Sequence, residues 1–168
     1  LGMKGADQIS GGAAGIAGGY DRVSYSIGTV GAGGTVSMGG AIGAGTATDQ
    51  WGNTDTLTSI ESVQGSQFAD TLTGNSANIN TYLRTYQPET FEGLGGNDTI
   101  NGGTNAPTHF AQVTYASSGA AVTVNLGTGT ASDGFGGTDQ LIALAGVNDS
   151  PHNDSFTGSS GNDEFGLT

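Results

Sequence analysis

The carboxylates are the side chains in this sequence that could do chemistry, and their spacing follows a rule. Ten of the eleven aspartates have an apolar or aromatic residue two positions later, where 34% hydrophobic residues would give about four by chance. These ten are Asp7, Asp21, Asp49, Asp55, Asp70, Asp98, Asp133, Asp139, Asp154 and Asp163. Because side chains alternate along a strand, the spacing predicts a turn that carries the carboxylate and a short strand whose second residue faces a core.

Carboxylates at such turns could bind a hard cation or cap the turn backbone. Calcium takes six to eight oxygen ligands in flexible geometry, and glycine permits backbone angles that let successive carbonyls converge on one point. The turns here are rich in glycine, with 33 glycines in 168 residues. Carboxylate pairs could also resemble the dyad of a glycosidase, but the periodicity of the turns accounts for them better.

Other catalytic chemistry finds no support in the sequence. There is no G-x-S-x-G, H-E-x-x-H or phosphate-loop motif and no cysteine, so nucleophile, zinc and nucleotide sites of those kinds are disfavoured. His109 and His152 have no partners at metal or triad spacing, and we expect exposed loop histidines. We therefore expect no enzymatic activity in these residues.

The elements that must position the turns are short strands arranged in a long internal repeat. Gly45 to Gly74 aligns with Gly129 to Gly158 at an offset of 84. Such short strands cannot bury a face alone and must stack on copies of themselves, while frequent glycine and the lack of helical periodicity disfavour helix. The predicted divisions are a first solenoid unit, an inserted loop, a second unit and the start of a third, over residues 1–74, 75–88, 89–158 and 159–168.

Aromatic residues recur at matched places in the two units. Tyr25 corresponds to Tyr115, and Trp51 corresponds to Phe135. Recurrence of this kind favours a stacked core or a surface ladder over a sugar-binding platform.

Four of the aspartates favour structural roles. For Asp55 and Asp139 we favour an Asx-type turn before a strand. Asp49 and Asp133 are expected in loops. The other turn carboxylates are therefore the candidates for calcium ligands.

The charge balance limits the partners. Fifteen acidic residues stand against three basic ones (Lys4, Arg22 and Arg84), which gives a formal net charge of −12. Binding to nucleic acid or to an anionic membrane surface is disfavoured because both need Lys and Arg, whereas a cation would relieve the repulsion. No apolar run reaches the roughly 18 residues of a membrane helix, and both ends interrupt a motif, so we expect a piece of a longer protein.

The glycine-rich turns resemble the RTX, or haemolysin-type, calcium-binding nonapeptide repeats of secreted bacterial proteins, G-G-x-G-x-D-x-U-x with U large and apolar. GLGGNDTIN (residues 93–101) is the best match, followed by GMKGADQIS (2–10) and GSSGNDEFG (158–166), while GSQFADTLT (65–73) keeps the first glycine and the D-x-U core. The resemblance implies calcium ligands at the position-six carboxylates and at carbonyls of the glycine-rich turn. The residues so implied are Asp98, Asp163, Asp154, Asp70, Asp7, Glu89, Asp21, Gly93 and Gly95.

Among these residues, calcium ligation is favoured over turn capping for Asp98 and Asp163. For Asp7, Asp70, Asp154 and Glu89 both roles remain open. In the family, consecutive nonapeptides lie on opposite edges and stacked turns are about eighteen residues apart. Spacings of 15 (Asp55 to Asp70, Asp139 to Asp154) depart from that rule, which suggests that regular rolls alternate with a broader β-helix.

The sequence thus predicts an all-β, right-handed parallel β-solenoid of β-roll or β-helix type, built of stacked short strands with calcium-binding turns. The resemblance implies Ca²⁺-dependent folding and stability of an extracellular or cell-surface bacterial protein, exported by type I secretion. One alternative is a self-assembling surface-layer, adhesin or filament subunit that uses the 75–88 loop as a contact. Another is a polysaccharide-associated module of a secreted enzyme, which three basic residues support poorly.

Overall fold

The computed structural model describes residues 5–11, 20–26, 33–38, 45–74, 88–103 and 110–167, and their regular elements are all β-strands. This confirms the predicted all-β class. The strands are short, three to five residues each. They are β1 (Gln8–Ser10), β2 (Arg22–Ser24), β3 (Thr35–Ser37), β4 (Gly45–Thr48), β5 (Thr54–Thr58), β6 (Ser62–Gln64), β7 (Thr71–Thr73), β8 (Glu89–Glu92), β9 (Thr99–Asn101), β10 (Ala111–Thr114), β11 (Thr123–Asn125), β12 (Thr130–Ser132), β13 (Thr138–Ile142), β14 (Gly146–Asn148), β15 (Ser155–Thr157) and β16 (Glu164–Gly166).

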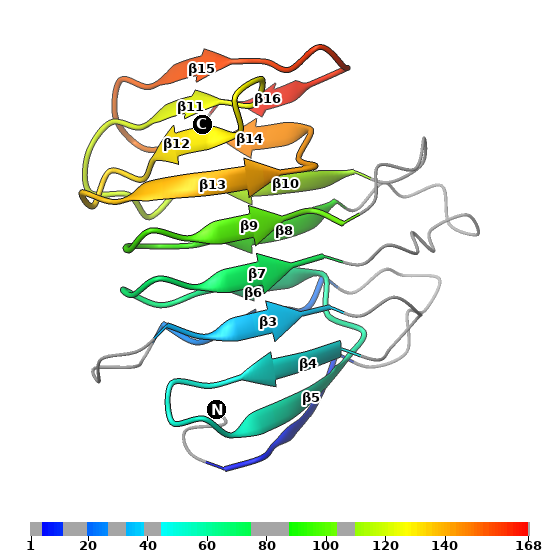
Figure 1. Ribbon diagram of the computed structural model, residues 1–168. Coiled ribbons are helices and arrows are strands. Elements are labelled where there is room, and N and C mark those ends of the chain that lie inside the picture. Colours follow the sequence, from blue (N-terminus) through cyan, green and yellow to red (C-terminus); the bar gives the residue numbers. More distant parts are fainter. Residues whose placement is uncertain are drawn as a thin grey trace.

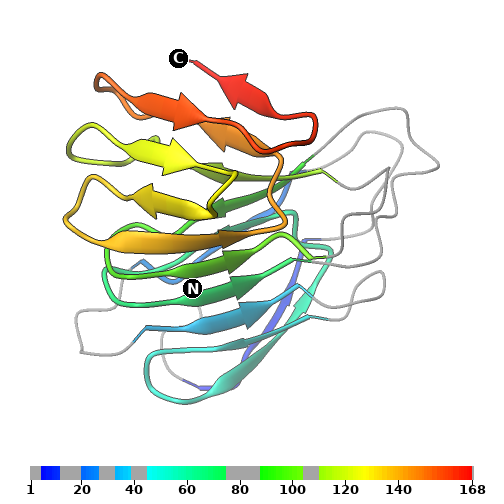
Figure 2. The same ribbon diagram turned by 45° about the horizontal axis from the view of Figure 1, so that its top comes forward.

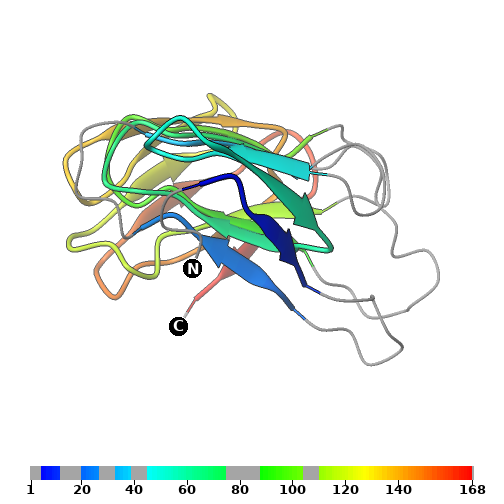
Figure 3. The same ribbon diagram turned by 90° about the horizontal axis from the view of Figure 1, so that it is seen from below.

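The strands form two sheets that lie face to face. One sheet has ten strands in the order β1-β5-β4-β3-β7-β9-β13-β12-β11-β15, and the other has six in the order β16-β14-β10-β8-β6-β2. Figure 1 shows the ten-stranded sheet in front, and Figure 3, which looks along the stack, shows the two layers. From β5 to β11 the chain passes repeatedly from one sheet to the other, so each strand lies beside one that is distant in sequence.

The pairing is parallel throughout the six-stranded sheet and mixed in the ten-stranded one. Four pairs are antiparallel, two within β3-β4-β5 and two within β11-β12-β13 (Figure 2). Short turns at residues 49–53 and 133–137 reverse the chain, and strands joined by so short a turn can pair only antiparallel. The pairing predicted for a parallel β-solenoid therefore does not hold in these two segments, and the sheet topology alone does not establish a parallel solenoid.

The interior is made of apolar columns, as the aspartate spacing predicted. Leu72, Ile100 and Leu141 pair in register across β7, β9 and β13, and all three are buried. In the six-stranded sheet, Val63 pairs with Phe91, which is fully buried. Stacking of equivalent residues supplies each three-residue strand with the apolar contact that it lacks alone.

Two aromatic residues do not follow this rule. Trp51 and Phe135 are 39% and 41% exposed, because they lie in the turns that join β4 to β5 and β12 to β13. Of the two expected places, a stacked core or a surface ladder, this exposure excludes the stacked core for both residues. Tyr115 is buried in the core, and Tyr25 is partly buried and packs against the core, as expected for these two matched tyrosines.

The strand pairing recurs along the chain. Parallel β1-β5 and β3-β7 in the first half correspond to parallel β9-β13 and β11-β15 in the second. The antiparallel triplet β3-β4-β5 likewise corresponds to β11-β12-β13. The long repeat read from the sequence is therefore a repeat of structure. The division at the 75–88 insertion stays a prediction, because residues 75–87 lie outside the described ones.

Candidate metal site

One edge of the ten-stranded sheet carries a column of aspartates, which we call the aspartate column. Its members stand at the start of parallel strands such as β7, β9 and β13, whose first residues are toward the left of Figure 1. Asp70 and Asp98 directly precede β7 and β9, and Asp139 is the second residue of β13. All three are at most 3% exposed. The name covers three groups at this edge, which the antiparallel strands separate: Asp7 with Asp55, then Asp70, Asp98 and Asp139, and finally Asp154.

Backbone amides link this column from strand to strand. Asp70 N donates to Asp98 Oδ1 at 2.8 Å, and Asp98 N donates to Asp139 Oδ1 at 3.1 Å. The same bond joins Asp7 N to Asp55 Oδ1 at 2.9 Å. Each carboxylate therefore binds the neighbouring turn through one oxygen, which leaves the second oxygen to be satisfied in another way.

In three turns, a serine four residues before the aspartate satisfies the second oxygen. Ser66 N donates to Asp70 Oδ2 at 2.6 Å, and the Ser66 hydroxyl lies 3.1 Å from the same oxygen. Ser150 contacts Asp154 through its amide and its hydroxyl, both at 2.7 Å. The third turn pairs Ser159 with Asp163 in the same way, at 2.6 and 2.9 Å.

The turn at 93–98 differs from these three. Leu94 occupies the serine position and has a positive φ of 70°. Asp98 Oδ2 is buried and has no hydrogen-bond partner among the described residues; we call it the open oxygen of Asp98. A Cβ at Gly93 would overlap this oxygen, so glycine is required for the carboxylate to lie against the turn. The pKa of Asp98 is raised to about 8, chiefly by burial, and the charges of Asp139, Asp70 and Asp133 contribute to that shift.

A second open oxygen lies on the neighbouring hairpin. Asp133 Oδ1 accepts hydrogen bonds from the amides of Phe135, Gly136 and Gly137 at 2.8–2.9 Å. Asp133 Oδ2 is buried without a partner in the described part of the chain. Burial raises the pKa of the adjacent Asp139 to about 6, and the charge of Asp133 adds to that shift.

The opposite edge carries a second acidic column, at the start of strands in the six-stranded sheet. Asp21 N donates to Glu61 Oε2 at 3.0 Å, and Glu89 follows Glu61 in register. Burial and the charge of Asp21 raise the pKa of Glu61. Ala111 and Ala145 take the next two places, before Asp163.

The sequence-predicted ligands are therefore divided between the two edges. Asp7, Asp70, Asp98 and Asp154 lie in the aspartate column, and the second acidic column holds Asp21, Glu89 and Asp163. Gly93 and Gly95 belong to the turn of Asp98. Glu89 and Asp98, nine residues apart, thus lie on opposite edges, as the resemblance implied.

Two of the four aspartates expected to be structural differ from the prediction. Asp55 and Asp139 are buried inside β5 and β13 and accept inter-strand hydrogen bonds, so the predicted Asx-type turn is wrong. Asp49 and Asp133 lie in turns as expected, and both cap them. His152 is exposed as expected, and His109 lies outside the described residues.

Sequence reasoning undervalued two carboxylates. GFGGTDQLI (134–142) places Asp139 at position six with the same glycines as GLGGNDTIN, a signal that was available in the sequence. Glu61 has no flanking glycine pattern, and only the strand register aligns it with Asp21 and Glu89.

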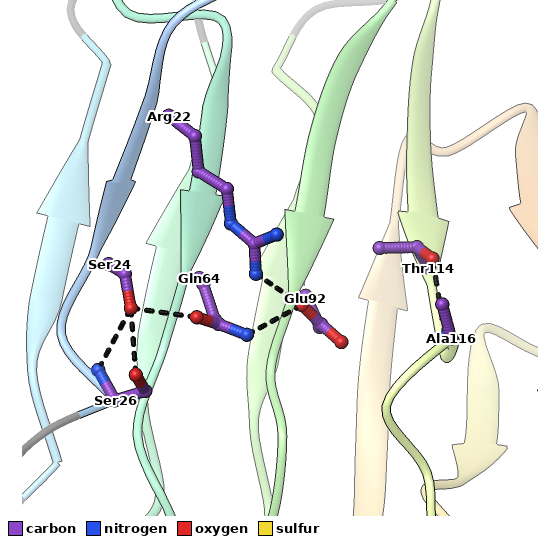
Figure 4. Close-up of polar contacts among 7 residues, drawn as sticks. All are labelled: Arg22, Ser24, Ser26, Gln64, Glu92, Thr114 and Ala116. Atoms are coloured by element: carbon purple, nitrogen blue, oxygen red, sulfur yellow. Dashed lines mark hydrogen bonds and ion pairs between the residues drawn. The ribbon is translucent and has the colours of Figure 1, made fainter.

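The basic residue Arg22 pairs with a residue outside both columns. Its guanidinium binds Glu92 Oε2 on the outer face of the six-stranded sheet, and Gln64 Nε2 donates to the same oxygen at 2.8 Å (Figure 4). This is the one ion pair within the described residues. Protons or a bound cation would neutralise the charge of the aspartate column.

The turn of Asp98 fits a hard cation. It offers a buried carboxylate oxygen with a free coordination position and a glycine-rich backbone, which are the oxygen donors that calcium prefers. No group of three or more His, Cys, Asp or Glu side chains lies within metal-binding reach among the described residues. Backbone carbonyls would therefore have to complete the ligand set.

The model of the RTX calcium-binding nonapeptide repeat (4 copies) matches residues 88–106 and 150–165. The chain carries RTX-type calcium-binding repeats. Each matched segment contains one carboxylate from each edge, Glu89 with Asp98 and Asp154 with Asp163. No curated protein and no solved structure matches the chain. A search of the described residues for helices able to span a membrane found none.

Proposed function

We propose that these RTX repeats bind Ca²⁺ and that calcium binding drives the folding and stability of an extracellular bacterial protein. The open oxygen of Asp98 is the observation that carries the proposal. It is buried within a column of carboxylates, and an unpaired charge in such a place destabilises a fold. A divalent cation would convert that repulsion into attraction between the stacked turns.

The proposed architecture is a right-handed β-solenoid of β-roll type, in which two antiparallel excursions interrupt the parallel coils. Support comes from the alternation of strands between the two sheets and from the parallel pairing of ten of the fourteen strand pairs in the described residues. Connections between parallel strands are right-handed in nearly all proteins.

The proposed location outside the cell follows from calcium supply. Extracellular calcium modules have dissociation constants of about 0.1 to 1 mM. A chain with such affinity would hold no calcium in the cytosol and would gain its full stability only after export, which fits type I secretion. We propose that the domain binds and folds but does not catalyse, since its aspartates serve turns and strand contacts.

Circular dichroism and sedimentation velocity on the full chain, with calcium titrated against EGTA, test the proposal. Calcium should increase β-structure and compactness at unchanged oligomeric state. Unchanged spectra in calcium and in EGTA would refute calcium-dependent folding. Large calcium-induced assemblies would favour the alternative of a self-assembling surface-layer or filament subunit, and magnesium at equal ionic strength controls for screening.

A further inference from the structure

The three serine-containing turns are complete without a ligand. In the Ser66 and Ser150 turns, the serine amide and hydroxyl supply two donors, and an amide of the neighbouring strand supplies a third. Asp154 shows the effect most clearly. Burial acts to raise its pKa, but hydrogen bonds from Val122 and Ser150 outweigh burial and the pKa is lowered.

The turn of Asp98 lacks these donors for a local reason. Leu94 has no hydroxyl, and its φ of 70° gives the turn a backbone conformation that leucine rarely adopts. Such strain persists where the surroundings enforce it, often at a ligand site. The open oxygen of Asp98 faces the backbone of Gly93 and no donor of the described residues.

The hairpin stacked on this turn adds a second carboxylate. A Cβ at Gly137 would overlap the carbonyl of Gly96 and lie 2.6 Å from Asp133 Oδ2. The Gly96 carbonyl and Asp133 Oδ2 therefore converge on the space beside Gly137. Asp133 and Asp98 are also close enough that the charge of one destabilises the charge of the other. Two open carboxylate oxygens thus lie on adjacent turns, and carboxylate oxygens are ligands that calcium prefers.

We propose that, in the turns of Asp70, Asp98, Asp154 and Asp163, the residue four positions before the aspartate decides whether the turn needs a cation. Serine closes the turn, whereas Leu94 leaves it open for a calcium ion that Asp98 and Asp133 bind. The inference rests on the proposed calcium-dependent folding and narrows it to one place. It also assigns a calcium-ligand role to Asp133, which directly precedes the nonapeptide GFGGTDQLI (134–142) and so lies outside that pattern. Asp70, Asp154 and Asp163 lose the ligand role that the resemblance implied.

Isothermal titration calorimetry with calcium on the full chain tests the assignment. Asp98→Asn and Asp133→Asn keep the shape and the Oδ1 acceptor of each side chain, so both variants should fold. Each should weaken calcium affinity about tenfold or more through the lost charged ligand. Asp154→Asn is the matched control in a serine turn, and its affinity should stay within about twofold of the unchanged chain.

The reciprocal exchange tests the serine rule. Leu94→Ser should raise the melting temperature in EGTA and shrink the increase that calcium produces, whereas Ser66→Ala should lower the melting temperature in EGTA. If Leu94→Ser keeps the full calcium response, or if Asp154→Asn weakens binding as much as Asp98→Asn, the serine rule is wrong while calcium-dependent folding stands. No loss of affinity in Asp133→Asn would remove Asp133 from the site. An absence of calcium binding by the unchanged chain would instead refute the proposed function itself.

Discussion

The amide of Asp70 donates a 2.8 Å hydrogen bond to Asp98 Oδ1, across 28 residues of sequence. The bond joins two turns whose carboxylates are both buried, so it brings like charges together along one edge of the sheet. An arrangement of this kind is stable only if the charges are neutralised. The same bond pattern that aligns the strands therefore makes the fold sensitive to cations and to protons.

Replacement of Asp98 by asparagine should make stability less dependent on calcium. The amide keeps an acceptor for Asp70 N but removes the buried charge, so stability in EGTA should rise and the calcium-induced increase should shrink. At a calcium concentration one hundred times the dissociation constant of the unchanged chain, that chain gains about 2.7 kcal/mol, and a tenfold weaker affinity leaves about 1.4 kcal/mol or less. Urea denaturation with calcium or EGTA measures both quantities.

Asp49→Asn is the control for this comparison. Asp49 caps the β4–β5 turn, where its Oδ1 accepts from the amides of Trp51 and Asn53 at 2.9 and 2.8 Å. The hydrogen bonds to Asp49 outweigh the effect of burial and lower its pKa, so its charge is already stabilised. Its calcium response should equal that of the unchanged chain. Equal loss in both variants would show that any buried charge in a turn has the same effect.

The calcium-free chain should become less stable as the pH rises. The folded-state pKa values of Asp98 and Asp139, about 8 and about 6, lie above the ordinary carboxyl value of about 4. Between about pH 4 and about pH 8 the folded chain therefore holds protons that the unfolded chain has released, and the free energy of unfolding falls with rising pH. Urea midpoints in EGTA at about pH 5 and about pH 8 measure the slope.

Two comparisons test whether Asp98 causes this pH dependence of stability. Asp98→Asn should flatten it, because the variant removes the group with the larger shift. Saturating calcium should also flatten it, since the cation takes the place of the proton. A steeper loss of stability toward low pH would contradict the assignment of Asp98 as a carboxyl that folds in its protonated form.

The pattern of apolar residues predicted the core because alternation along a strand is a local property. Ile100 and Leu72 are buried where the D-x-U spacing placed them. The stacking of turns was not predictable in the same way. Asp139 and Asp154 are 15 residues apart, yet β12 and β11 lie between their strands in the sheet. That order depends on which strands pair across long separations.

The serine contacts show a second limit of prediction from the sequence. Ser66 and Ser150 stand four residues before an aspartate, and this spacing is visible in the sequence. Its consequence is not, because it depends on whether the serine hydroxyl and the carboxylate point toward one another. Asp133 shows the same limit. Its sequence is that of an ordinary loop residue, and only the three amides that donate to its Oδ1 identify it as a buried cap of the turn.

Gly93→Ala should abolish calcium binding and leave the strands largely intact. A methyl group at this position would overlap Asp98 Oδ2 and force the carboxylate out of the turn. Gly161→Ala is the matched control, since the nearest atom to its Cβ, Ser159 Oγ, would be at an ordinary 3.5 Å. Calorimetry should detect no calcium binding to the first variant and unchanged affinity in the second. Retained affinity in Gly93→Ala would mean that the ligands lie elsewhere.

Tyr115→Phe should destabilise the second unit without changing the calcium site directly. The Tyr115 hydroxyl donates to Asp139 Oδ2 at 3.1 Å, and both residues are buried. Loss of that donor leaves a buried carboxylate oxygen unsatisfied, which costs about 1–3 kcal/mol. Tyr25→Phe removes the matching bond to Asp55 Oδ2, also 3.1 Å. Because Tyr25 is only partly buried, water can replace its hydroxyl and the loss should be smaller. Urea denaturation of both variants in saturating calcium compares the two, and an equal or larger loss in Tyr25→Phe would show that burial does not set the strength of these bonds.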